Sequence, residues 1–452
     1  MGDIPTSRIG RFARLAALGT RAGAERLVSA VGDKKAEARL AATAAEALGT
    51  MRGLALKLGQ MASYVDGAVP EEHKDTYEAA LRKLRAAAPP MPKEAALRVL
   101  TRELGAPPDA LFASFEIEPF AAASIGQVHR AALKDGREVA VKVQYEGVAA
   151  AVQSDLKNAS LFTSLAGPLA SRVRAKDQLA ELRARFEEEL DYGHEAARQR
   201  RFAEVFRGDA RVRVPEVVDE LSTARVLTTT FARGVGFEAA CAASEDERRA
   251  WAETLWRFVS TSMLGHGLFN ADPHPGNYLF SPGGVVHFLD FGCTREIRAE
   301  RMDDLRGSHR AAVEGDLTAF VACAFRMLDV APYAEQERLS REYLLACFEP
   351  LFARGPFHMT RAYTKRLYDD MMHVSRQAVL GRIGQFEPIP PEWLFFNRLQ
   401  LGFYSVLARL DVPVDYAAVE RSVLDRFAPV AAPASPRARA RVAPPALDDG
   451  GA

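Results

Sequence analysis

The spacing of apolar and polar positions divides the chain into helical and extended stretches. Residues 8–105 are rich in alanine, leucine and charged residues at roughly helical intervals, with breaks at "VDGAVP" and "AAAPPMP". From residue 115 onward, short β-branched runs alternate with turn residues, a pattern typical of an antiparallel sheet. The runs that we assign to this sheet are 115–120, 124–133, 137–143 and 211–231.

The remaining pattern is helical, apart from the C-terminal tail. A long insertion of helical composition separates the third and fourth runs, and after residue 236 the chain is chiefly helical to residue 425. The tail is rich in proline, alanine and arginine, a composition typical of disorder. The sequence therefore predicts an α+β fold. Its expected parts are a helical N-terminal extension (1–105), a sheet-bearing lobe with the helical insertion (106–234), a helical lobe (235–425) and a disordered tail (426–452).

Composition and charge narrow the function classes. Lysine plus arginine and aspartate plus glutamate each number 59, so no overall basic charge argues for nucleic acid as a partner. Residues 1–60 carry ten basic and five acidic side chains, which fits a membrane-surface helix but favours an ordinary packed helix with a solvated basic face. Four cysteines without a CxxC pair or a secretory leader indicate a reducing, cytoplasmic compartment.

The most apolar C-terminal stretch, "WLFFNRLQLGFYSVLARL" (393–410), is a candidate for a membrane-spanning helix. It is interrupted by Arg398 and Arg409 and falls short of the roughly 20 apolar residues that a span needs. We therefore predict no transmembrane helix and interpret this stretch as a core helix rather than a lipid-facing one.

The stretch "NADPHPGN" (270–277) carries the strongest chemical signal. Asp272, Asn277 and Asp290 are spaced like the D-x4-N catalytic loop and the later D-F-G segment of protein kinases. Phosphoryl transfer needs hard oxygen ligands for Mg²⁺, which Asn277 and Asp290 can supply, and a carboxylate near the acceptor, which Asp272 can supply. The same residue types also favour caps and turns, so the triplet alone leaves that alternative open.

Two upstream segments extend the kinase pattern. In "REVAVKV", Lys142 occupies a strand like the one that carries the phosphate-binding lysine of kinases, and Glu195 is its candidate carboxylate partner because an unpaired buried ammonium is costly. The alternative is that Lys142 points to solvent. Ahead of this strand, kinases have a glycine-rich loop, whereas here only Gly126 is glycine, which predicts a stiffer nucleotide loop. The residues that we assign to that loop are Ala121, Ala122, Ala123, Ser124 and Gly126.

Six motifs together resemble the UbiB family of atypical kinases, also called AarF-domain-containing or coenzyme Q-type kinases. They are "LKLGQMAS", "FAAASIGQVHRA", "VAVKVQ", "EELDYGHEA", "NADPHPGN" and "LDFG", within residues 50–410. The resemblance implies a two-lobed protein-kinase-like fold that binds adenine nucleotide (ATP or ADP) and Mg²⁺. It also implies a role in ubiquinone or isoprenoid-lipid biosynthesis or homeostasis, with an isoprenoid lipid or quinone precursor as partner and peripheral contact with the inner face of a membrane.

The resemblance also assigns roles residue by residue. It makes Lys142 and Glu195 the kinase ion pair, Asp272 the catalytic-loop aspartate, and Asn277 and Asp290 the metal ligands. Thr230 and Phe231 fall at the adenine-side hinge, and four further residues match the family's K-x-G-Q and E-x-D signatures: Lys57, Gln60, Glu189 and Asp191. We expect Lys57 to pair with Glu189 and to hold the N-terminal extension over the peptide-binding position, the alternative being a surface ion pair.

Several positions depart from the family pattern. Asn270 stands where the family commonly has histidine, Thr230 stands where it usually has an acidic residue, and Lys142 and Glu195 are 53 positions apart. No A-P-E motif follows "LDFGC", which argues against a conventional protein kinase. Two alternatives to a lipid-linked atypical kinase or ATPase stay open: a small-molecule phosphotransferase of the aminoglycoside or choline kinase type, and a non-catalytic, nucleotide-gated lipid-binding protein.

Overall fold

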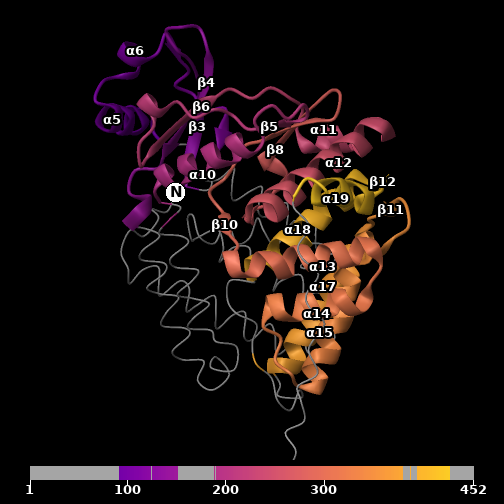
Figure 1. Ribbon diagram of the computed structural model, residues 1–452. Helices are drawn as coiled ribbons and strands as arrows, with labels where there is room; N and C mark the ends of the chain where they lie inside the picture. Colours follow the sequence, from indigo (N-terminus) through magenta and orange to yellow (C-terminus); the bar gives the residue numbers. More distant parts are fainter. Residues whose placement is uncertain are drawn as a thin grey trace, which may run out of the picture.

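The computed structural model describes residues 91–123, 125–150, 188, 190–379, 387 and 394–427. These residues form a smaller lobe built on an antiparallel sheet and a larger, mainly helical lobe (Figure 1). The two-lobed α+β architecture predicted from the sequence is confirmed for this part of the chain. Lys57, Gln60, Ser124 and Glu189 lie outside the described residues, as do most of the expected N-terminal extension and tail.

The small lobe contains one antiparallel sheet in the order β1-β3-β4-β6, with β2 added beside β3. Its strands are β1 (Ser114–Phe115), β2 (Ala121–Ala122), β3 (Gly126–Ala132), β4 (Glu138–Gln144) and β6 (Val226–Thr230). The helices with it are α5 (Lys93–Leu104), α6 (Pro108–Leu111) and α10 (Tyr192–Val205), with a 3-10 turn at Asp219–Leu221. The turn between β3 and β4 uses Gly136 at φ 90°, a conformation that favours glycine.

Strand β4 separates the core of this lobe from the side chains that face the other lobe. Val139, Val141 and Val143 are fully buried and form one core with α5. Because successive side chains of a strand point to opposite faces, Lys142 lies on the face turned away from α5. Helix α5, which the sequence placed in the N-terminal extension, therefore packs as part of the sheet-bearing lobe.

Helix α10 joins the two lobes. At its start, Tyr192 and Ala196 pack with Ile125 and Leu227 of the small lobe. Farther along, Phe202 belongs to the large-lobe core, where its ring centroid lies 4.8 Å from that of Phe291. A shift of this helix would therefore disturb both lobes.

The large lobe is mainly helical, with short strands at its boundary with the small lobe. Its helices are α11 (Phe237–Cys241), α12 (Glu245–Ser260), α13 (Met302–Glu314), α14 (Leu317–Leu328), α15 (Ala334–Cys347), α16 (Glu349–Phe352), α17 (Arg361–Val379), α18 (Leu394–Leu410) and α19 (Tyr416–Leu424). Short helical turns occur at Thr261–Gly265, Pro275–Asn277 and Ala299–Arg301. Its strands are β5 (Val212–Arg213), β7 (Leu268–Asn270), β8 (Tyr278–Ser281), β9 (Val285–Phe288), β10 (Thr294–Glu296), β11 (Phe357–His358) and β12 (Pro413–Val414).

The pairing predicted for the segment that contains β5 was wrong. We expected residues 211–231 to complete the antiparallel sheet, but β5 pairs in parallel with β9 in a separate sheet, β5-β9-β8. From this stretch, β6 joins the sheet of the small lobe, antiparallel to β4, and Val217 forms a single antiparallel bridge with Thr229 of β6. Parallel pairing needs no hairpin and joins segments far apart in the chain, so local alternation could not identify the partner of β5.

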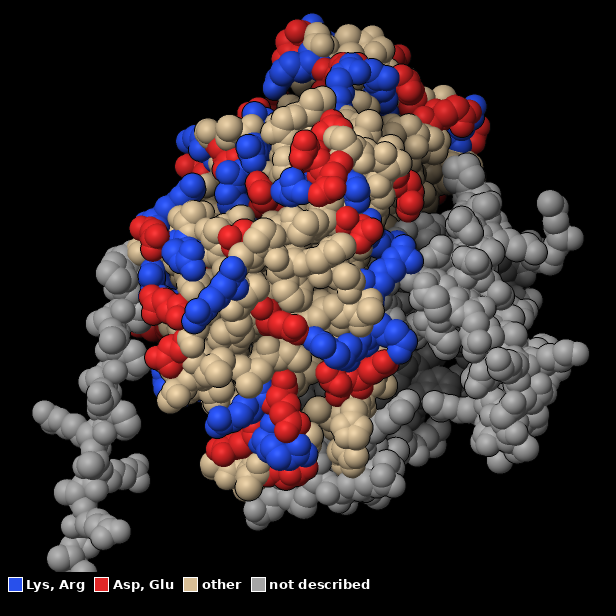
Figure 2. Space-filling model, turned by 90° about the vertical axis from the view of Figure 1, so that its right-hand side faces the viewer, with Lys and Arg blue, Asp and Glu red and all other residues tan. Residues whose placement is uncertain are grey.

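The apolar C-terminal stretch forms α18, and its prediction as a core helix is confirmed. Leu401, Phe403, Leu407 and Leu410 are buried in the main core of the large lobe. Among the described residues, no helix is long and apolar enough to cross a membrane. On the face shown in Figure 2, acidic and basic side chains are interspersed rather than segregated.

Candidate active site

A cavity of about 710 Å³ lies between the two lobes. From the small lobe it is lined by the alanine segment, by alternate residues of β4 and β6, and by α10. From the large lobe it is lined by the loop after β7 and by the residues that directly follow β9. The predicted residues that line it are Ala121, Ala122, Ala123, Lys142, Glu195, Thr230, Phe231, Asp272, Asn277 and Asp290.

The ion pair at the inner wall joins β4 to α10. Lys142 Nζ donates to Glu195 Oε1 at 2.8 Å and to Oε2 at 2.9 Å, across 53 positions of sequence. The same nitrogen lies 3.8 Å from Asp290 Oδ2 and 4.9 Å from the centre of the Tyr192 ring. Burial lowers the pKa of Lys142, but the carboxylates of Glu195 and Asp290 outweigh it, so the net shift raises the pKa above 10.5. Lys142 is therefore a cation fixed at the cavity wall.

Glu195 is placed by the way in which its helix begins. Asp191 is the N-cap of α10, and its Oδ1 accepts a hydrogen bond from the Gly193 N–H at 2.8 Å. This cap satisfies one of the amide groups that a helix start leaves unpaired. Glu195 follows in the first turn, where a negative charge is favourable to the helix dipole. The observed contact of Asp191 is thus a helix cap, while its expected signature partners Lys57, Gln60 and Glu189 lie outside the described residues.

The loop after β7 holds Asp272 and Asn277 in a fixed relation. Asn277 Nδ2 donates to the Asp272 carbonyl at 3.0 Å, and the Asp272 N–H donates to Asn270 Oδ1 at 3.1 Å. Pro273 packs on α18, where a Cβ added to Gly402 would lie 2.6 Å from Pro273 Cγ. The two prolines and this close approach restrict the loop, so that Asp272 and Asn277 face the same cavity.

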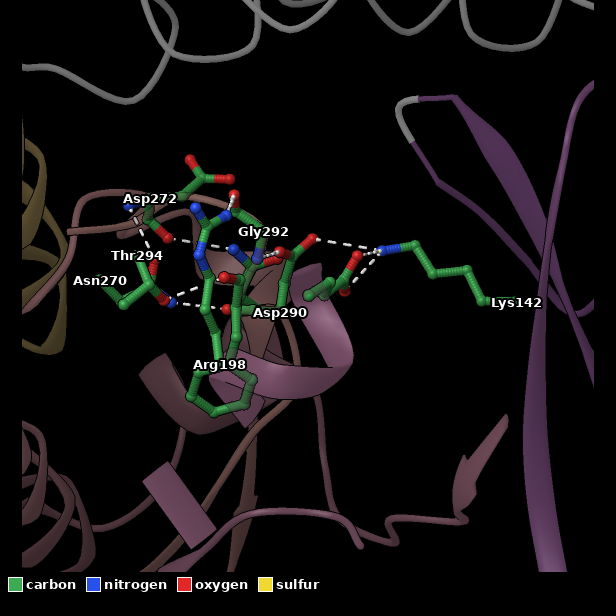
Figure 3. A network of polar contacts seen from close by, with 10 residues as sticks. Lys142, Arg198, Asn270, Asp272, Asp290, Gly292 and Thr294 are labelled. Atoms are coloured by element: carbon green, nitrogen blue, oxygen red, sulfur yellow. Dashed lines mark hydrogen bonds and ion pairs between the residues drawn. The ribbon is translucent and has the colours of Figure 1, made fainter. Parts of the chain in front are cut away.

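The D-F-G segment is held by hydrogen bonds to all three of its carbonyl groups (Figure 3). Asn270 Nδ2 donates to the Asp290 carbonyl at 2.5 Å, Thr294 Oγ1 to the Phe291 carbonyl at 2.9 Å, and Arg198 Nη1 to the Gly292 carbonyl at 3.0 Å. Asp290 Oδ1 in turn accepts from the Gly292 N–H at 2.9 Å. The carboxyl group of Asp290 is therefore oriented by its own backbone segment.

Asn270, a departure from the family pattern, has a structural role in this site. Its amide nitrogen contacts the D-F-G segment and its amide oxygen contacts the backbone of Asp272. One side chain thus connects the loop of Asp272 with the loop of Asp290. Asparagine often bonds to the backbone two residues on, a local signal that the sequence contained and that we did not use.

Two other predicted site residues, Gly126 and Thr230, lie differently with respect to the cavity. Gly126 is not among the residues that line the cavity; a Cβ there would lie 2.4 Å from the Val143 carbonyl oxygen and 2.7 Å from the Tyr192 hydroxyl. Its small size thus permits close packing between β3, β4 and α10. Thr230 does line the cavity, and its Oγ1 accepts from the Glu216 N–H at 2.9 Å.

Sequence reasoning missed several residues that line or support the cavity. Thr229 and Leu227 line it from β6. They are the neighbours of Ala140 and Lys142 across the β4–β6 pair, so the four side chains share one face of the sheet. Strand alternation around Lys142 could have found the residues of β6. Arg198 had no such signal, because its partner, the Gly292 carbonyl, lies 94 positions away in the sequence.

The oxygen atoms present suit a magnesium ion that is shared with phosphate. Within the described ranges, no group of three or more His, Cys, Asp or Glu side chains is arranged to hold a metal. Asn277 uses its amide nitrogen within its own loop, which leaves its amide oxygen as the group available to a metal. Mg²⁺ commonly takes one or two protein oxygens and completes its shell with phosphate and water, and Asn277 with Asp290 fits that set.

Comparison with known proteins agrees with the geometry. Residues 83–324 match the family described as the ABC1 atypical kinase-like domain. The chain is 32% identical over 379 residues to "Atypical kinase COQ8B, mitochondrial" of Rattus norvegicus, covering 81% of this chain and 68% of that protein. It is also 32% identical over 246 residues to "Atypical kinase COQ8, mitochondrial" of Saccharomyces cerevisiae, covering 54% of this chain and 48% of that protein.

A solved structure and a plant relative extend the comparison. The structure titled as the complex of Rv3197 with erythromycin, from Mycobacterium tuberculosis, superposes with a TM-score of 0.60 at 29% identity, covering 83% of this chain and 93% of that one. "Protein ACTIVITY OF BC1 COMPLEX KINASE 8, chloroplastic" of Arabidopsis thaliana is 31% identical, covering 66% of this chain and 40% of that protein. The chain thus spans less than half of the yeast and plant relatives. With the matched domain, the rat relative and the kinase-like lobes in agreement, this chain belongs to the ABC1 atypical kinase-like family, also known as the UbiB or COQ8 family.

Proposed function

We propose that this chain binds adenine nucleotide with Mg²⁺ in the cavity between its lobes and acts as an atypical kinase or ATPase in ubiquinone or isoprenoid-lipid biosynthesis or homeostasis. One observation carries the proposal: the Lys142–Glu195 pair, Asp272, Asn277 and Asp290 all line a single cavity of about 710 Å³. That volume lies in the usual range for small-ligand pockets, about 300 to 1,000 Å³. The residue types are those of phosphoryl transfer.

The phosphates would be held from the inner wall. The Lys142 cation, fixed by two hydrogen bonds to Glu195, would offer its third N–H and its charge to phosphate oxygens. Asn277 and Asp290 would hold Mg²⁺, which when bound neutralises charge on the phosphates. The β6 hinge, with Thr230 and Phe231, would cover the adenine side, and Ala121, Ala122 and Ala123 would cover the phosphates.

Asp272 would act on the acceptor. Its side chain lines the cavity, and its backbone is held by both Asn270 and Asn277. A carboxylate in that position can orient a hydroxyl group or a water molecule and accept its proton. Since all of these groups act by position and charge, the proposed catalysis needs no covalent intermediate.

The acceptor we propose is a small molecule, a lipid or water rather than a folded protein. Only nine residues separate Gly292 from the start of α13 at Met302, and they are occupied by β10 and the turn Ala299–Arg301. No separate peptide-docking segment therefore stands between the D-F-G segment and the next helix. The same observation supports the second candidate, a small-molecule phosphotransferase, which differs from the first in needing no lipid.

Nucleotide binding and turnover by the purified chain test this proposal. We would measure ATP binding and ADP release with Mg²⁺, with and without vesicles containing anionic phospholipid and a soluble quinone-precursor mimic. Asp290→Asn removes a metal-binding carboxylate and is expected to lower turnover at least about 100-fold, a loss typical of removing one preorganised charge-stabilising group. Asp246→Asn, at an almost fully exposed position of α12, is the matched control.

The outcomes separate the candidates. Turnover stimulated by the lipid components and lost only in Asp290→Asn supports the lipid-linked kinase or ATPase. Transfer to a soluble alcohol or amino sugar, without lipid stimulation, favours the small-molecule phosphotransferase. Nucleotide binding without turnover under every condition would leave a nucleotide-controlled lipid-binding protein, and the absence of nucleotide binding would refute the proposal.

A further inference from the structure

Arg198 connects the D-F-G segment to the helix that carries the kinase ion pair. Its Nη1 donates to the Gly292 carbonyl at 3.0 Å, and its Nη2 donates to Glu188 Oε2 at 2.5 Å. Arg198 lies three positions after Glu195 in α10, so the two side chains occupy the same side of the helix. In Figure 3 the guanidinium group extends to the backbone of Gly292, beside Asp290.

Gly292 lies between the two carboxylates of the site. Its N–H donates to Asp290 Oδ1 at 2.9 Å, and its own carbonyl, in the following peptide group, accepts from Arg198. A Cβ added at Gly292 would lie 3.2 Å from Asp290 Oδ1 and 3.7 Å from Glu195 Oε2. A shift of this glycine by a few tenths of an ångström would therefore change the position of the Asp290 carboxyl group.

The three carbonyl anchors of the D-F-G segment differ in origin. Asn270 in β7 and Thr294 in β10 belong to two strands of the large lobe that pair with each other. Arg198 alone among these three anchors comes from α10, which also packs against the small lobe. Of these three anchors, Arg198 is the one that can transmit the position of α10, and with it that of Glu195, to the backbone beside the aspartate, in addition to the packing of Phe202 on Phe291.

We propose that Arg198 is a positioning residue that couples the metal-binding orientation of Asp290 to the Lys142–Glu195 ion pair, an inference that rests on the proposed function. When α10 lies where Glu195 pairs with Lys142, Arg198 holds Gly292, and Gly292 orients Asp290 toward Mg²⁺. Partners that orient a metal ligand in this way typically contribute about 10- to 100-fold to metal affinity. Arg198 itself touches neither nucleotide nor metal in this scheme.

The test compares variants of the full chain that differ only in this contact. Arg198→Met keeps an unbranched apolar stem but removes the donors. Arg198→Lys keeps a cation that can serve one acceptor but not both in the fork geometry of arginine. Arg201→Met is the matched control, because Arg201 lies on the same helix and makes an exposed ion pair with Glu296. The probe is a fluorescent ADP analogue, titrated in EDTA and then with increasing Mg²⁺.

Arg198→Met is expected to weaken the Mg²⁺ affinity of the nucleotide-bound protein about tenfold. Its nucleotide affinity in EDTA should match that of wild type, and Arg198→Lys should recover part of the loss. A purely structural role for Arg198 would instead lower the melting temperature and both affinities together. Equal loss of both affinities, or parity of Arg198→Met with Arg201→Met, overturns the inference.

Two further outcomes are distinguishable. If Arg198→Met does not fold, Arg198→Lys is compared with Arg201→Lys: a selective loss of Mg²⁺ affinity supports the coupling, and parity overturns it. If wild type shows no Mg²⁺-dependent nucleotide binding, the proposed function fails and this inference falls with it. A normal wild type with an unaffected Arg198→Met overturns the inference alone.

Discussion

Two glutamates are buried in the part of the chain that the structure describes, and they are used in opposite ways. Glu195 is 6% exposed and lines the cavity between the lobes, where it pairs with one cation. Glu420 is 1% exposed and lies inside the large lobe, where its carboxyl group contacts Trp256 Nε1 at 2.8 Å, Ser260 Oγ and His309 Nδ1. The three partners of Glu420 come from α12 and α13, so this cluster ties α19 to both helices.

The difference lies in what each carboxyl group is available to do. Glu420 is surrounded by fixed partners, and a buried carboxyl group satisfied in this way specifies how the helices pack. Glu195 holds a lysine that lines a large cavity and whose neighbour is Asp290. Burial of a charged or polar group is thus no sign of function by itself. The size of the cavity beside the group distinguishes the two cases, because it is about 710 Å³ beside Glu195 and about 50 Å³ beside Glu420.

The largest effect is expected at Glu420. Glu420→Leu leaves Trp256, Ser260 and His309 without their common partner, so the free energy of unfolding should fall by about 3 kcal/mol. Urea denaturation measures the loss, and titration with ADP at low temperature should show unchanged affinity for the folded fraction. A selective loss of nucleotide affinity would contradict the view that this cluster is purely structural.

Glu195→Gln should show the reverse pattern. The amide keeps the shape but leaves the Lys142 ammonium with weaker compensation, so we expect a stability loss of about 2 kcal/mol, typical of a charged hydrogen-bonded group. Nucleotide affinity should fall as well, because Lys142 is then free to pair with Asp290, which lies 3.8 Å away. Calorimetric titration with ADP checks this, and unchanged affinity would break the comparison between the two glutamates.

A smaller effect is expected at Ser260, one of the three partners of Glu420. Ser260→Ala removes one of the donors to Glu420 and should lower the free energy of unfolding by about 1 kcal/mol. Ser422→Ala, an exposed serine on α19 whose hydroxyl bonds only locally to the Val419 carbonyl, is the matched control. Equal effects of the two variants in urea denaturation would mean that Ser260 adds nothing specific to the cluster.

The smallest effect is expected at Tyr192, whose ring lies beside Lys142. Within the described part of the chain, the buried Tyr192 hydroxyl has no hydrogen-bond partner, so Tyr192→Phe should change stability by less than about 0.5 kcal/mol at pH 8. Burial raises the pKa of Tyr192 above its ordinary value of 10.0 in the folded protein. Just above pH 10, therefore, Tyr192 ionises in the unfolded chain but not in the folded one. The stability of wild type therefore falls as pH rises above 10, and Tyr192→Phe should fall less steeply in urea denaturation at pH 8 and 10.5.

Much of the fold and the site follows from local patterns in the sequence. The alternation in β4 and the spacing of Asp272, Asn277 and Asp290 were sufficient to identify residues that the structure brings to one cavity. The prediction for β5 failed because its parallel partner is distant in the chain. The packing role of Gly126 could not be predicted, because a glycine that allows close packing looks the same in sequence as one that approaches a ligand.

The support of the site was harder to predict than the site itself. Side chains that act chemically are recognisable by type and spacing, whereas those that hold them in place bond to backbone carbonyls, which every residue possesses. Arg198 and Thr294 are of this second kind, since each of them holds a carbonyl of the D-F-G segment. Such contacts appear only once the chain is folded.

The anchoring of all three D-F-G carbonyls has a consequence for inhibitor design. Phe291 is fully buried against Phe202. Thr294 holds its own carbonyl, and Asn270 and Arg198 hold those of its two neighbours. Compounds that require this phenylalanine to leave its site must break three hydrogen bonds, each worth about 1 kcal/mol net, and expose an aromatic ring. Chemical probes for this protein are therefore best designed to fill the cavity between the lobes, leaving Phe291 in place.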